Sequence, residues 1–280
     1  MNRRHWFFAA TTFVLLVAMT LTASAQARRG YRQAVRHGLP KYTNHYYYNA
    51  DGSFNEANAK RAYAELFRYH NYSIAKPVLD QDPKASLAGD KLWIMDFNIG
   101  DFSNVGMAGI FVVNDKEHGY FGHEIYLLPY QMIPQHQHMD AEGKAPKHEA
   151  WQVRHGSIWC FSEGGSEADL AALPPEVAKA MKSQIDAKAI NCFKAVELKP
   201  GEMAVLEGLK KKHFMMAGPE GAIVTEYASY HAPSGLVINH KDGKPGNTQA
   251  KPADQPKKEE PKKEEKKPEV KKEEKKEEKK

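Results

Sequence analysis

Two histidines, His136 and His138, stand two residues apart just after an apolar run that has the pattern of a β-strand. Side chains two residues apart in an extended segment project from the same face. Two neutral imidazoles on one face provide half of a first-row transition-metal site. Glu149 begins the next apolar run, and His213 follows a later one after a basic turn. Together these side chains would form a three-nitrogen, one-oxygen site with coordination positions left open for a substrate that has two adjacent oxygens.

The order of these residues resembles the first motif of the cupins, which reads His-x-His, then Glu, then six residues to Gly. Here Gly156 is the glycine, and ten residues separate His138 from Glu149, more than in most cupins. This longer interval, with Lys147 two residues before Glu149, resembles the D-lyxose isomerase group, a cupin family that interconverts aldoses and ketoses with manganese. Segments 198–202 and 218–230 fit the same pattern, and the likeness spans residues 126–238.

The resemblance implies a function and a set of roles. The expected metal is divalent, with Mn favoured and Fe, Co, Ni or Zn as alternatives, and its expected ligands are His136, His138, Glu149 and His213. Glu226 is the implied acid/base, and Lys147 a lysine that contacts the substrate or handles protons. Isomerisation moves a proton between C1 and C2 through an enediolate, so the metal would hold O1 and O2, Glu226 would carry the proton and Lys147 would donate to the oxygens. The predicted function is a metal-dependent sugar isomerase.

Two other functions fit the same ligands. A cupin dioxygenase would hold Fe(II) there, and a carbohydrate-binding or sensing module would keep the metal without catalysis. Isomerisation requires a base such as Glu226, whereas oxygen activation requires a redox-active metal. His148 could replace Glu149 as a ligand, or it could support a ligand through a hydrogen bond without contacting the metal. Other histidines are expected to be ordinary surface or core residues: His118, His123, His155, His231 and His240.

Short apolar runs separated by Gly, Pro, Asn and Asp predict antiparallel strands. They cover 92–97, 108–113, 124–128, 150–161, 202–206, 222–227 and 236–238. This spacing is typical of an all-β sandwich or small barrel, and the resemblance implies a cupin barrel, that is, a double-stranded β-helix or jelly roll, over residues 91–240. Residues 28–90 are expected to form an N-terminal arm and a helix that packs on the barrel. A short helical insertion is expected within 166–186.

The N-terminal helix is predicted from a capping box and an apolar stripe. Ser53 and Glu56 have the spacing of the capping box. The stripe is formed by Ala59, Ala62, Tyr63, Leu66 and Phe67. In the insertion, Val177, Met181 and Ile185 recur every four residues. The tyrosines at 42 and 46–48 are expected to pack this arm against the barrel rather than to stack on sugar rings.

The two ends of the chain have compositions unlike its centre. Residues 1–27 have two arginines, an apolar stretch and then small residues that suit a signal peptidase, which predicts a cleaved signal peptide and an exported, periplasmic or extracellular protein. The alternative is an uncleaved single membrane anchor, although the apolar stretch is shorter than a typical span. Residues 241–280 are predicted to form a disordered tail, since 251–280 consist almost entirely of Lys, Glu and Pro. No later segment is apolar enough to span a membrane.

Net charge does not indicate a nucleic-acid partner. The formal charge of +5 comes from the two ends, because residues 28–250 hold as many basic as acidic residues. One expected partner is a small-molecule sugar. A second copy of the chain is also expected, because the resemblance to cupins and the presence of edge strands favour a homodimer. Cys160 and Cys192 could pair in an oxidising compartment or remain buried thiols.

Overall fold

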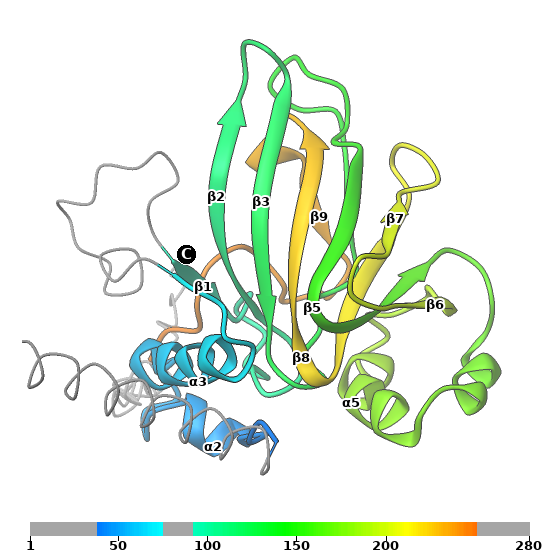
Figure 1. Ribbon diagram of the computed structural model, residues 1–280. Coiled ribbons are helices and arrows are strands. Elements are labelled where there is room, and N and C mark those ends of the chain that lie inside the picture. The colour runs from blue at the N-terminus through cyan, green and yellow to red at the C-terminus, as the bar shows by residue number, and fades with distance from the viewer. Residues whose placement is uncertain (1–37, 75–91, 251–280) are drawn as a thin grey trace, which may run out of the picture. The chain divides into compact units, whose positions relative to one another are not determined.

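The computed structural model describes residues 38–74 and 92–250, and its main feature is a curled antiparallel sheet (Figure 1). Its strands are β1 Trp93–Met95, β2 Met107–Asp115, β3 Tyr120–Leu127, β4 His136–His138, β5 Glu149–Ser162, β6 Lys194–Leu198, β7 Met203–Val205, β8 His213–Ser229 and β9 Leu236–Ile238. The strand order is β1-β2-β3-β8-β4-β9, and β5 pairs with β6, β7 and β8. The predicted all-β fold is confirmed, and its sheet curls into a partial barrel.

The two longest strands, β5 and β8, position the residues of interest. They pair along almost their whole lengths, and the register places Glu226 of β8 opposite Trp151 of β5. On its other edge β8 pairs with β3, where Glu226 lies opposite His123. The start of β8 pairs with β4, which places His213 opposite His136. Residues far apart in the sequence therefore meet on one concave surface.

The helix that follows the N-terminal arm is α3, Glu56–Tyr69, and a short helix, α2, Asn44–Tyr47, precedes it. The predicted capping box is wrong. Asn55 is the N-cap, and its side chain accepts from the backbone N–H of Asn58 at 3.0 Å. The Ser53 hydroxyl lies too early in the chain to cap this helix and instead donates to Asp51 at 2.6 Å.

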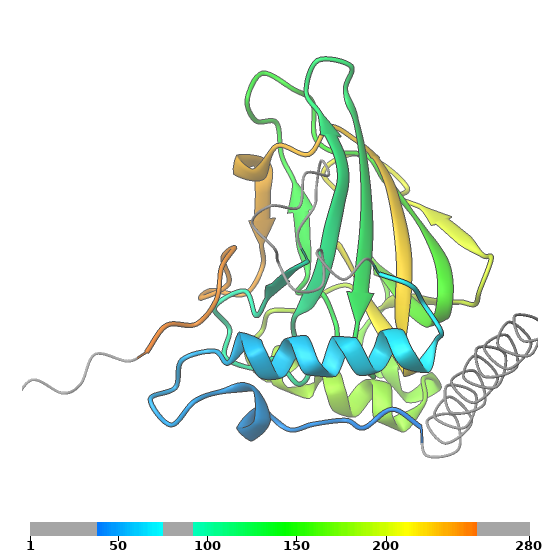
Figure 2. The ribbon, with the colours of Figure 1, turned by 60° about the vertical axis from the view of Figure 1, so that its left-hand side comes forward.

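The predicted apolar stripe of α3 is confirmed, because all five of its side chains are buried. They pack with Ala108, Tyr126 and Ile223 from the sheet and with Leu92, which precedes β1. Figure 2 shows α3 crossing one end of the strands. Tyr47 belongs to the same cluster, so part of the N-terminal arm packs with the barrel.

The predicted insertion forms two helical segments, a 3₁₀ helix η1, Glu167–Ala172, and α5, Pro175–Asp186. Val177 and Met181 are buried in a separate cluster, and Ile185 packs against it. A second 3₁₀ turn, η2, Pro233–Gly235, precedes β9. Cys160 and Cys192 are free thiols. Within the two described ranges, no helix has the length and hydropathy needed to cross a membrane.

Residues 241–250 differ from the disordered tail predicted to begin at 241, because they form hydrogen bonds with the body. Asp96, fully buried, accepts from the hydroxyls of Tyr48 at 2.9 Å and Thr248 at 2.6 Å, and from the backbone N–H of Thr248 at 2.9 Å. The Asn247 side chain accepts from the Asp96 backbone N–H and donates to the carbonyl of Ile94. The predicted signal peptide and residues 251–280 lie outside the described residues.

Gly156, the glycine of the cupin-like motif, has φ of +69°, at a register shift between β5 and β8. A Cβ atom there would lie 1.9 Å from the carbonyl oxygen of Gly221. Gly156→Ala should therefore lower the free energy of unfolding by about 3 kcal/mol, part from left-handed strain and the rest from displaced backbone. Urea unfolding measures this loss. Gly143→Ala is the matched control, because Gly143 has φ of +72° with no atom within 4 Å. Equal losses in the two variants would show that the Gly221 contact is unimportant.

Candidate active site

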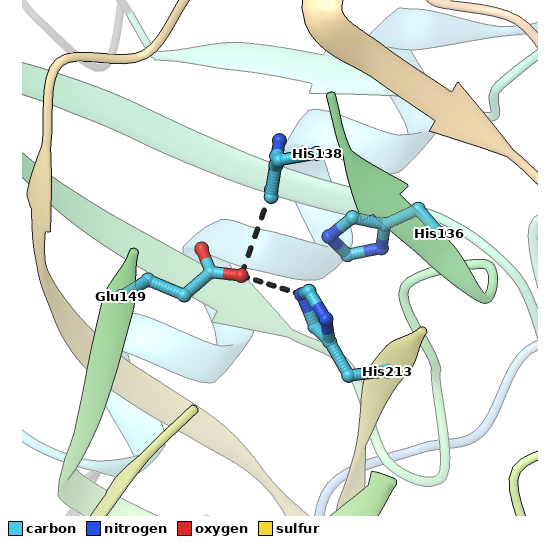
Figure 3. A group of neighbouring side chains, drawn as sticks. All are labelled: His136, His138, Glu149 and His213. Atoms are coloured by element: carbon cyan, nitrogen blue, oxygen red, sulfur yellow. Dashed lines mark ion pairs between the residues drawn. The ribbon is translucent and has the colours of Figure 1, made fainter. Parts of the chain in front are cut away.

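The four predicted metal ligands come together from three strands (Figure 3). His136 and His138 lie on β4, Glu149 begins β5 and His213 begins β8. One ligand atom from each residue lies within 4.8 Å of the others, and all four side chains are buried. His138 Nε2 lies 3.5 Å from Glu149 Oε1.

The donor atoms of this group fit a divalent cation. His138 Nε2, His213 Nε2 and Glu149 Oε1 are buried and form no hydrogen bond to any described residue outside this group, and His213 Nε2 lies 2.5 Å from Glu149 Oε1. Three lone pairs turned toward one another in a buried site are costly unless a cation lies between them. The backbone orients two of the rings, because the Nδ1 atoms of His136 and His213 lie 2.9 and 2.8 Å from backbone carbonyl oxygens. That contact fixes the tautomer and leaves Nε2 for a metal.

The surroundings of His136, His138 and Glu149 hold each side chain in the protonation state that can bind a metal. Burial lowers the pKa of His136 well below its ordinary value and also lowers the pKa of His138, so both rings remain neutral. Burial alone would raise the pKa of Glu149, but the Lys147 ammonium and His213 outweigh it and hold that pKa well below its usual range. His136 and His138 therefore present neutral imidazoles, and Glu149 presents an ionised carboxylate, at neutral pH.

Lys147 and Glu226 lie directly beside the metal group, that is, the four candidate ligands His136, His138, Glu149 and His213. Lys147 Nζ lies 2.6 Å from Glu149 Oε2 and also contacts Glu226 Oε1. Their exposed fractions are 7% and 2%, so neither is the solvated surface residue that a loop lysine or a strand-end glutamate commonly is. Burial raises the pKa of Glu226 well above its ordinary value, with the Lys147 ammonium opposing it. Burial by itself would lower the pKa of Lys147, but the carboxylates of Glu149 and Glu226 outweigh this effect and raise the pKa above its ordinary value. The amine therefore stays charged.

A cavity of about 290 Å³ brings these groups to a common space. Its polar lining consists of His123, His136, His138, Lys147, Glu149, Glu226 and His231. The remaining wall is apolar and includes Trp93, Phe111 and Trp151. The arrangement can bind two oxygens of a small molecule at the metal group and transfer a proton at the carbon beside them.

His123 and His231, which the sequence predicted to be ordinary surface or core histidines, both line the cavity. His123 is 4% exposed and its Nδ1 lies 2.9 Å from Glu226 Oε2. The available signal was the alternation of Phe121, His123 and Ile125, which face inward together from β3. His148 does not join the metal group, because its Nε2 contacts the Leu206 carbonyl oxygen instead.

His231 gives a pH-dependent test of burial. Desolvation, and then the Lys147 ammonium, lower the pKa of His231 to about 3. In the unfolded chain this ring takes up a proton near pH 6.5, so acidification favours unfolding by about 1.4 kcal/mol per pH unit below that value. Between pH 6.5 and 5 the metal-free protein should lose about 2 kcal/mol that His231→Gln does not lose. Urea unfolding of both proteins at the two pH values measures this difference, and parallel losses would contradict it.

Comparisons with known proteins find relatives among curated sequences and among solved structures. No protein-family model matches the chain. The D-lyxose/D-mannose isomerase of Thermosediminibacter oceani is 30% identical over 141 residues, which are 50% of this chain and 72% of that protein. The D-lyxose ketol-isomerase of Cohnella laeviribosi is 28% identical over 171 residues, 61% of this chain and 82% of that protein. Among solved structures, ligand-free L-ribose isomerase of Cellulomonas parahominis is 14% identical, covers 72% of this chain and 96% of its own, and has a TM-score of 0.47.

Proposed function

Since this chain belongs to the D-lyxose isomerase family, we propose that it is a metal-dependent sugar isomerase that interconverts an aldose and a ketose. The observation that carries the proposal is the placement of Glu226 and Lys147 beside the metal group in one cavity. Isomerisation requires a base such as Glu226, whereas sugar binding does not, and oxygen activation depends on a redox-active metal.

The roles follow from the contacts. Glu226 takes a proton from one of two adjacent substrate carbons and returns it to the other, so a single base on one face of the substrate is sufficient. Its raised pKa makes it a stronger proton acceptor than an exposed glutamate. The Lys147 ammonium donates hydrogen bonds to the substrate oxygens as negative charge develops on them. The hydroxyl proton that one oxygen loses is gained by the other, so the net reaction moves one hydrogen between the carbons and one between the oxygens.

The resident metal is proposed to be manganese, held by His136, His138, Glu149 and His213. When bound, a divalent cation polarises the carbonyl and stabilises the negative charge that forms on the two oxygens. The mixed imidazole and carboxylate donors also suit iron, cobalt, nickel and zinc.

The test joins metal analysis to a screen of pentoses and hexoses, including D-lyxose and D-mannose. The protein without residues 1–27 is supplied with Mn²⁺, and ketose formation is followed by chromatography, with His138→Ala as the metal-site control. Conversion that disappears in His138→Ala is the expected result. Sugar binding without product would indicate a binding module, and bound iron with oxygen uptake would indicate a dioxygenase.

We also propose that the protein is exported, with residues 1–27 acting as a cleaved signal peptide. N-terminal sequencing of the protein recovered from a fractionated bacterial host tests this proposal. A mature chain that begins after residue 25 or 27, outside the cytoplasm, is expected. A full-length chain in the cytoplasm would refute export and leave the catalytic proposal intact.

A further inference from the structure

The strongest contact of Glu226 that the proposed reaction does not use is the one with His123. The two residues lie directly opposite each other on β3 and β8, and His123 Nδ1 is 2.9 Å from Glu226 Oε2. Lys147 occupies the other oxygen of the same carboxylate, Oε1. Both oxygens of Glu226 are therefore held from the protein side, which leaves the carboxylate few orientations.

The His123 ring is itself held firmly. Trp93 stacks on it with centroids 5.3 Å apart at 22°, and Phe111 meets it edge to face at 4.9 Å. On a third side the ring reaches the backbone at Gly109, where a Cβ atom would lie 2.3 Å from Nε2. A glycine on β2 thus makes room for this imidazole. A ring packed on these sides fixes the direction of its N–H bond.

The direction of the hydrogen bond follows from the partners of the two ring nitrogens. Burial lowers the pKa of His123 well below its ordinary value, so the ring is neutral and carries one proton. Nε2 has no hydrogen-bond partner among the described residues. A buried N–H without an acceptor is costlier than an unfilled acceptor, so the proton belongs on Nδ1. Nδ1–H then donates to Glu226.

We propose that His123 is the positioning residue of the catalytic base, donating from Nδ1 to Glu226 Oε2 and holding the carboxylate toward the substrate carbons. The inference rests on the proposed function, because it assigns a role within that reaction. His123 acts through Glu226, and its hydrogen bond keeps the proton-accepting oxygen aligned. Misalignment of a base by about 1 Å costs on the order of 100-fold in rate.

The kinetic test compares two substitutions at the same position. His123→Leu removes the donor and keeps an apolar side chain within the aromatic shell, whereas His123→Asn places an amide N–H close to the position of Nδ1. His123→Leu should lower kcat by about 100-fold and change KM by less than about threefold, with unchanged metal content. His123→Asn should recover at least about tenfold of that loss. A purely structural role would lower metal content or stability in both variants and show no recovery.

A second measurement is independent of turnover. Long-range ¹H–¹⁵N correlation spectra of histidine-labelled, zinc-loaded protein report the tautomer of each ring, and the signal missing from His123→Asn identifies His123. The Nδ1–H tautomer is expected, with a shift of its proton in Glu226→Gln. An Nε2–H tautomer would overturn the inference even in an active enzyme.

The outcomes separate this inference from the proposed function. If the wild-type protein converts sugars and His123→Leu retains its kcat within about threefold, positioning by His123 is wrong and the isomerase stands. If the wild-type protein converts no sugar, the isomerase proposal fails, and the base-positioning role fails with it. The tautomer and its response to Glu226→Gln then decide only whether the hydrogen bond exists.

Discussion

Glu226→Gln is expected to lower kcat for aldose–ketose conversion by about 10³-fold, within the range that positioned acid–base groups contribute. Glutamine has nearly the same shape and keeps an oxygen for Lys147, but its amide cannot take up the proton. KM should change little, because Glu226 is not one of the proposed metal ligands and its replacement leaves that site intact. Steady-state kinetics with the best sugar, together with metal analysis, measures both effects.

The control for this variant is Glu220→Gln. Glu220 is an exposed glutamate that accepts a hydrogen bond from Tyr69 at 2.8 Å, away from the cavity. Its replacement should leave kcat unchanged. Full activity of Glu226→Gln with a sugar that the wild type converts would remove Glu226 from the reaction and exclude the proposed proton transfer.

Lys147→Met should destabilise the metal-free protein by about 3–5 kcal/mol at pH 7. Methionine fills a similar volume, but it leaves Glu149 and Glu226 buried side by side without the ammonium that contacts both of them. The cost should shrink as the pH falls, because protonation of one carboxyl removes the repulsion. Adding Glu226→Gln to Lys147→Met should recover part of the loss for the same reason. Urea unfolding of the two single variants and the double variant measures the coupling.

Lys116→Met provides the matched control. Lys116 forms an ion pair with Glu142 at 3.1 Å, but its side chain is 53% exposed. Removing an exposed pair should cost no more than about 1 kcal/mol. Comparable losses in the free energy of unfolding of Lys116→Met and Lys147→Met would show that the buried Lys147 ammonium stabilises the protein no more than an exposed lysine does.

Local sequence patterns predicted much of the site because its parts lie at strand ends. His136 and His138 share a face through the two-residue period of a strand, and the motif spacing indicated Glu149 and Lys147. The partner of Glu226 could not be predicted in this way. His123 lies 103 residues earlier, and only the register between β3 and β8 brings the two together.

The errors of the sequence interpretation have local physical causes. Ser53 and Asn55 are both good caps, and the choice between them depends on where the first helical turn begins, which tertiary packing decides. Residues 241–250 contain few apolar side chains, so hydrophobic periodicity gave no signal there. They are held by hydrogen bonds to one buried carboxylate, Asp96, which cannot be read from their composition.

The hydrogen bonds to Asp96 can form only after the residues that donate them have been synthesised. Asp96 accepts hydrogen bonds from Tyr48 near the start of the described chain and from Thr248 near its end. Pro245, from the same late segment, lines the cavity. A nascent chain that has not yet emerged beyond β9 therefore has a buried carboxylate without all of its donors and a substrate cavity without part of its wall. The cavity wall is complete only once residue 245 has been synthesised, so a polypeptide released before that point lacks part of the wall.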